Sequence, residues 1–75
     1  MRIATWNVAG IRAHIGALLE WLQQEKPDIV VLQETKTVDE TFPRLELEAL
    51  GYNVEVHGQK GWNGVAILSL VPFDE

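Results

Sequence analysis

Two side chains with oxygen ligands stand at the ends of two predicted strands. Asn7 lies near the end of the strand predicted over residues 2–8, and Glu34 follows the apolar run at residues 29–32. Neighbouring parallel strands end at one edge of a sheet, roughly 4.8 Å apart. An amide oxygen and a carboxylate placed there can bind one hard cation such as Mg²⁺, which prefers oxygen ligands and keeps several waters. Spacing alone favours simpler roles: a strand-end cap for Asn7 and a solvated acid for Glu34.

The elements that would position these side chains form a βαβ unit. Alternation over residues 2–8 predicts a strand, and apolar residues between positions 11 and 22 follow helical spacing. The dipeptide Lys26-Pro27 ends this helix, because a residue before proline is pushed out of the helical region. The run at 29–32 suits a strand buried on both faces. The two strands should be parallel, with a right-handed crossover.

The second half of the chain predicts a helix and a hairpin. A helix should begin near Phe42-Pro43, with Leu47 and Leu50 facing inward, and end at Gly51. Residues 52–56 and 65–70 read as two strands, antiparallel to each other and joined by a glycine-rich loop. The whole chain, residues 1–75, therefore predicts an α/β fold of order βαβαββ with a mixed sheet and one domain.

Composition restricts the classes of protein. The chain has 75 residues, 47% of them hydrophobic, which is typical of a packed domain. It has no cysteine, so disulfides and thiolate metal sites are excluded, and this fits an intracellular protein. No secretory signal or membrane-spanning run is present in the sequence. The net charge of −5 has two readings: no contact with nucleic acid, or carboxylates that serve a metal.

Two helices cannot cover a sheet of several buried-type strands. We therefore expect an incomplete domain that is the N-terminal segment of a larger one. Val30, Leu32, Val65 and Ile67 should then be partly exposed, or buried when the chain associates with itself.

The motifs at residues 5–13 (TWNVAGIRA), 27–36 (PDIVVLQETK), 51–53 (GYN) and 57–66 (HGQKGWNGVA) resemble the exodeoxyribonuclease III and apurinic/apyrimidinic endonuclease family. They occur in family order over nearly the whole chain. The stretch at 58–66 is most similar to the bacterial exonuclease III branch. The resemblance implies the N-terminal part of a four-layer α/β sandwich, from a hydrolase of base excision repair located in the bacterial cytoplasm with the nucleoid.

The resemblance also implies chemistry. Asn7 and Glu34 match the family's metal ligands, with Mg²⁺ as the ion and Mn²⁺ as an alternative. The expected substrate is double-stranded DNA with abasic sites or 3′ ends, cut by metal-assisted hydrolysis of phosphodiesters. The family's general base and its other catalytic groups come from later segments, so we expect no catalytic residue in this chain. No site for an organic cofactor and no membrane contact are expected.

A set of basic, small and aromatic residues matches positions that face DNA in the family. Arg12 could pair with a phosphate at a helix start, and Lys36 could reach a phosphate near the metal. Their simpler readings are an ordinary exposed arginine and an ion pair with Glu34 or Asp39. Trp62 could lie against DNA or fold back onto Tyr52. The expected DNA-binding residues are Arg12, Ala13, Lys36, Lys60, Gly61 and Trp62.

One position departs from the family pattern. Ala9 stands where family members commonly carry Asn or Asp, and alanine offers no side-chain ligand. This puts in doubt a second metal position or outer support there. Two other functions remain as alternatives: another phosphodiesterase or phosphatase of the same superfamily, and a truncated, non-catalytic binding domain.

Overall fold

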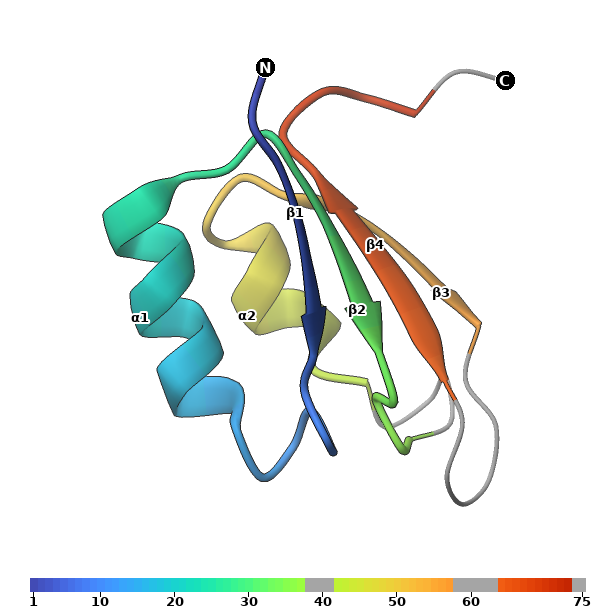
Figure 1. The fold of residues 1–75 in the computed structure, drawn as a ribbon. Helices are drawn as coiled ribbons and strands as arrows, with labels where there is room; N and C mark the ends of the chain where they lie inside the picture. Colours follow the sequence, from blue (N-terminus) through green and yellow to red (C-terminus); the bar gives the residue numbers. More distant parts are fainter. Residues whose placement is uncertain (38–41, 58–63, 74–75) are drawn as a thin grey trace.

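One mixed four-stranded sheet with two helices on one face makes up the fold (Figure 1). The structure is a computed structural model that describes residues 1–37, 42–57 and 64–73. It confirms the predicted α/β class and the order of elements. The elements are β1 (Ile3–Asn7), α1 (Ile15–Glu25), β2 (Ile29–Gln33), α2 (Arg44–Glu48), β3 (Asn53–His57) and β4 (Val65–Ser69).

The βαβ unit forms as predicted. β1 and β2 are parallel, with Ile3 opposite Ile29 and Asn7 opposite Gln33. Helix α1 buries Leu18 and Leu22 against the sheet. It ends at Lys26, which is left-handed (φ 46°) and whose N–H donates to the Leu22 carbonyl at 3.0 Å. Because Pro27 follows, the helix cannot continue.

Strand β4 lies between β2 and β3, giving the order β1-β2-β4-β3. The predicted antiparallel pairing of β3 with β4 is confirmed. β4 is also antiparallel to β2, with Val31 opposite Ile67 and Gln33 opposite Val65. The sequence predicted a mixed sheet but not this second pairing, which joins all four strands and places β1 and β3 at the edges.

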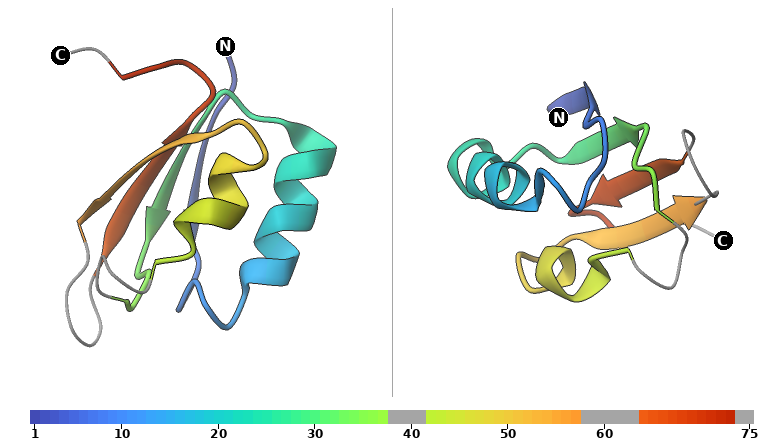
Figure 2. Two further views of the ribbon diagram at one scale, coloured as in Figure 1. Left: turned by 180° about the vertical axis from the view of Figure 1, so that it is seen from behind. Right: turned by 90° about the horizontal axis from the view of Figure 1, so that it is seen from below.

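The two faces of the sheet differ from the expectation in one respect. Both helices cover the same face (Figure 2). Val30 and Leu32 lie on that face and are fully buried, so the prediction that they would be exposed is wrong. Register explains this, because they pair with Leu68 and Ala66, which are buried as well. Of the four residues expected to be exposed, Val65 (43% exposed) and Ile67 (37%) lie on the other face and meet the expectation.

The helices begin later than predicted. Ile11 donates its N–H to the Thr35 carbonyl at 2.9 Å, which holds residue 11 in a loop. Arg12 and Ala13 consequently lie in the turn before α1, and not at its first residues. Helix α2 begins at Arg44, with Pro43 at its N-cap and not at the first helical position. Within the described part of the chain, no helix is long and apolar enough to cross a bilayer.

Candidate metal centre

Asn7 and Glu34 lie together at the edge of the sheet where β1 and β2 end. Asn7 is paired with Gln33 in the parallel register, so Glu34, the residue after Gln33, lies next to Asn7. The Asn7 amide Nδ2 donates to Glu34 Oε2 at 2.5 Å, and Asn7 Oδ1 accepts the backbone N–H of Ala9 at 3.1 Å. Both side chains are exposed to solvent. The convergence predicted from the strand ends is therefore present.

Backbone hydrogen bonds hold the two strand-end loops side by side. Val8 donates to Gln33 O at 3.0 Å, and Gly10 donates to Glu34 O at 2.8 Å. The parallel pairing thus extends past the strands into both loops. Three of the four described non-glycine residues with positive φ lie in these loops: Ala9 (49°), Glu34 (54°) and Lys36 (56°). Such backbone conformations are disfavoured for L-residues and cluster at functional sites.

The chemistry of the donors fits a hard, largely hydrated cation. Glu34 keeps one carboxylate oxygen outside its bond to Asn7, and an amide oxygen has a second lone pair beyond the one that Ala9 uses. Among the described residues, no group of three or more His, Cys, Asp or Glu side chains could hold a metal. Zinc sites commonly use such a group, whereas Mg²⁺ needs only one or two protein carboxylates.

Two of the predicted DNA-binding residues come from the loops that follow β1 and β2. Arg12 is exposed in the turn after β1, and Lys36 is exposed two residues past Glu34. The Lys36 stem lies over Gly10, with Cδ 3.8 Å from where a Gly10 Cβ would be. Each of the two loops therefore carries one exposed cationic residue. Ala13 is exposed in the same turn as Arg12, while Lys60, Gly61 and Trp62 lie outside the described residues.

Gln33, the last residue of β2, bonds through its side chain to β1. Its Nε2 donates to Thr5 Oγ1 at 2.5 Å across the β1–β2 pair. This bond lies on the face without helices. The residue that supports Glu34 is Asn7, which the sequence predicted as a metal ligand or a strand-end cap and not as a hydrogen-bond donor to Glu34.

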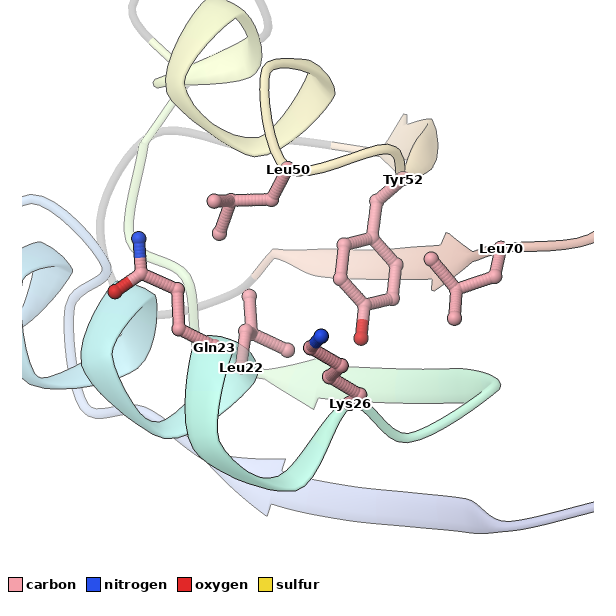
Figure 3. A pocket seen from close by; sticks show the side chains of 6 residues that line it. All are labelled: Leu22, Gln23, Lys26, Leu50, Tyr52 and Leu70. Atoms are coloured by element: carbon pink, nitrogen blue, oxygen red, sulfur yellow. The ribbon is translucent and has the colours of Figure 1, made fainter.

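One hollow of the described surface lies away from Asn7 and Glu34. It has a volume of about 400 Å³ and lies between the ends of α1 and α2, at the opposite edge of the sheet. Figure 3 shows Leu22, Leu50, Tyr52 and Leu70 around it, with Lys26 at its rim. The Tyr52 hydroxyl donates to the Pro27 carbonyl at 2.7 Å. Burial, and then the nearby Asp28 carboxylate, raise the pKa of Tyr52 above its ordinary 10.0, while Arg2 lowers it.

A mixed α/β sheet with an amide oxygen and a carboxylate at one strand edge offers the kind of oxygen donors that metal-assisted hydrolysis of phosphate esters uses. The profile of the Endonuclease/Exonuclease/phosphatase family matches residues 4–75, and the chain belongs to that family. The resemblance found in the sequence motifs is thereby confirmed.

Relatives and solved structures agree with this assignment. The chain is 44% identical to exodeoxyribonuclease III of Haemophilus influenzae over 69 residues, which is 92% of this chain and 26% of the relative. An AP endonuclease from Archaeoglobus fulgidus matches with a TM-score of 0.90 and 46% identity, over 93% of this chain and 27% of that one. The 3′ phosphatase NExo from Neisseria, bound to a product DNA hairpin, matches with a TM-score of 0.90 and 40% identity, over the same shares. The chain thus spans about a quarter of the length of these proteins.

Proposed function

We propose that this chain provides the first metal ligands and part of the DNA-binding surface of a magnesium-dependent DNA-repair nuclease of the exodeoxyribonuclease III type. The observation that carries the proposal is the contact of Asn7 with Glu34 at the strand ends, in two loops that also carry the exposed residues Arg12 and Lys36. The proposed substrate is double-stranded DNA with abasic sites or 3′ ends. The names of the relatives, a nuclease and an AP endonuclease, support this choice. The proposed location is the bacterial cytoplasm.

Each residue has a defined part in this proposal. Asn7 Oδ1 and the Glu34 carboxylate would hold Mg²⁺, which supplies Lewis-acid stabilisation of a phosphate and its leaving oxygen when bound. Mn²⁺, which also accepts oxygen ligands, is the alternative ion. Arg12 and Lys36, one from each loop, would neutralise phosphate charge. Because Asn7 also donates to Glu34, it fixes the direction in which the carboxylate faces.

These 75 residues are proposed to have no nuclease activity alone. Hydrolysis needs a base or a water-positioning group within hydrogen-bond reach of the nucleophile. Asp28 cannot serve, because it lies at the other end of β2 and accepts the backbone N–H of Arg2 at 2.7 Å. Asp39 lies outside the described residues. The purified chain should leave abasic DNA intact in excess Mg²⁺, and EDTA-sensitive nicking lost in Glu34→Ala would contradict this.

The metal assignment can be tested on the chain itself. Paramagnetic Mn²⁺ broadens NMR signals of nuclei close to it, so titration should first broaden those of Asn7, Ala9 and Glu34. Glu34→Gln removes the charge but keeps the shape and should abolish this selective broadening. Asp28→Asn removes an acid at the opposite end of the sheet and is the matched control. Broadening that survives in Glu34→Gln, or that centres on Asp28, would show that the metal assignment is wrong.

The catalytic part needs a larger protein. In a chimera, this chain replaces the matching segment of the Haemophilus influenzae relative. The chimera should nick abasic DNA, and Glu34→Ala in it should lower the rate at least 10–100-fold, the loss typical of residues that merely support a metal. Asn7→Ala should lower the rate through site geometry. A chimera that is active and unaffected by Glu34→Ala in limiting Mg²⁺ would refute the role of Glu34.

A further inference from the structure

A tight contact joins the loop after β2, which carries Glu34, to the start of β4. Thr35, the residue after Glu34, is fully buried, and its N–H donates to the Gly64 carbonyl at 3.2 Å. Gly64 has a φ of +128°. A Cβ added to Gly64 would lie 2.2 Å from Thr35 Oγ1 and 3.2 Å from the Lys36 backbone nitrogen. Side-chain atoms cannot approach so closely, so only glycine permits this packing.

Thr35 also connects to the loop after β1. Its carbonyl accepts the N–H of Ile11 at 2.9 Å, next to the bond from Gly10 to the Glu34 carbonyl at 2.8 Å. Thr35 is therefore bonded on one side to the loop that follows Asn7 and on the other to Gly64. Gly64 immediately precedes β4 and follows the stretch that contains Lys60, Gly61 and Trp62. One buried residue thus links the loop after Asn7, the segment that carries Glu34 and Lys36, and the residue that precedes β4.

Within residues 1–37, 42–57 and 64–73, the buried Thr35 Oγ1 has no hydrogen-bond partner. Burial of a hydroxyl without a partner generally lowers stability. What the structure shows for this side chain is its close packing on the glycine backbone.

We propose that Thr35 and Gly64 form a positioning contact. The volume of the threonine side chain, fitted against a residue without Cβ, sets where Glu34 and Lys36 stand relative to Asn7. The inference rests on the proposed function, because it concerns the same ligands, but it adds two residues that touch neither metal nor DNA. They act only through the backbone of the 34–36 segment.

The test uses the side-chain amide of Asn7, whose Nδ2 donates to Glu34 and so reports their relative placement without any metal. Gly64→Ala should shift the ¹H–¹⁵N signals of this amide and weaken the selective Mn²⁺ broadening. Adding Thr35→Ala removes Oγ1, the atom nearest to the added Cβ, and should move the signals back toward the wild-type position. Thr35→Val keeps the shape and should leave them unchanged.

Gly51→Ala is the matched control. Gly51 also has a positive φ (+96°), but an added Cβ would meet only Leu70 Cδ2 at an ordinary 3.8 Å. This variant carries similar backbone strain at the opposite edge of the sheet, so it should lower the urea midpoint without shifting the Asn7 amide. A general loss of stability is thereby separated from a change in the site.

Several results would overturn the inference. One is a folded Gly64→Ala variant with an unchanged Asn7 amide, and another is a Thr35→Val variant that shifts it as Gly64→Ala should. If Gly64→Ala does not fold, the measurement becomes rescue of folding by Thr35→Ala, and failure to rescue also overturns the contact. A different result would refute the proposed function. The wild-type chain would show no Mn²⁺ broadening at Asn7 and Glu34, although the metal-free spectra of the variants shift as expected.

Discussion

Replacing Ala9 with glycine should stabilise the protein. Ala9 has a φ of +49°, in the left-handed region, and its side chain is exposed. An L-residue there is disfavoured by about 1–2 kcal/mol because its Cβ crowds the following carbonyl. Glycine removes that strain but gives the unfolded chain more freedom, worth about 0.4–1 kcal/mol in the opposite direction. The net expected gain for Ala9→Gly is about 0.5–1 kcal/mol.

Urea unfolding measures this gain. For so small a chain the slope is about 1 kcal/mol per molar urea, so the midpoint should rise by about 0.5–1 M with the slope unchanged. Ala17→Gly is the control, because Ala17 is also exposed but lies within α1. There the same substitution should destabilise by about 0.5–1 kcal/mol. The sign of the effect thus depends only on the backbone conformation.

A midpoint lowered equally by both substitutions would refute the left-handed conformation of Ala9. A rise with a changed slope would instead indicate an altered unfolded state. Ala9→Asn extends the test, since asparagine tolerates the left-handed region and also supplies an oxygen. It should stabilise the fold and strengthen Mn²⁺ binding, whereas Ala9→Gly should stabilise without the second effect.

Three further outcomes are expected. The raised pKa of Tyr52 means that the folded state holds the phenol proton more tightly than the unfolded state does. The resulting contribution to stability is complete below about pH 10 and is lost as pH rises through the folded pKa. Urea midpoints should therefore fall in that pH range, and Tyr52→Phe should make the fall smaller. Lys26→Gly should raise the midpoint, because Lys26 ends α1 at a φ of 46°, and Lys26→Ala should not. In sedimentation experiments the chain should self-associate through the sheet face that carries Ile67. Ile67 lies opposite Glu55, so the Ile67→Lys variant should stay folded and become monomeric. A variant that associates as much as the wild type would exclude this face.

Local patterns in the sequence determined most of the fold. The alternation at residues 2–8, the apolar run at 29–32 and the Lys26-Pro27 stop predicted the βαβ unit within a few residues. What they could not predict was a pairing between distant strands. Nothing in the apolar alternation at 65–70 says that β4 pairs with β2 as well as β3. Nothing local says that both helices cover the face of Val30 and Leu32 either, so their exposure was predicted wrongly.

The candidate site divides in the same way. The proximity of Asn7 and Glu34 was predicted because strand ends meet at a sheet edge. Their assignment as metal ligands, and the assignments of Arg12 and Lys36, came from the motif resemblance. The Thr35–Gly64 contact was missed, since it depends on a distance between two loops and on a backbone angle, and neither has a signal in residue type. Gly64 stood among several glycines of one loop, with nothing in the sequence to distinguish it.

The place of β4 in the sheet has a consequence for the order of folding. It is the last strand in the described sequence but lies between β2 and β3, with hydrogen bonds to both. During synthesis, β2 and β3 therefore have no bridging strand until residues 65–69 have emerged, and such non-local pairing is slow to form. Gly64, at the entrance of β4, also supplies the carbonyl that holds Thr35. The loop that carries Glu34 thus gains its final anchor only when β4 is inserted, and metal-binding competence should appear late, together with the completed sheet.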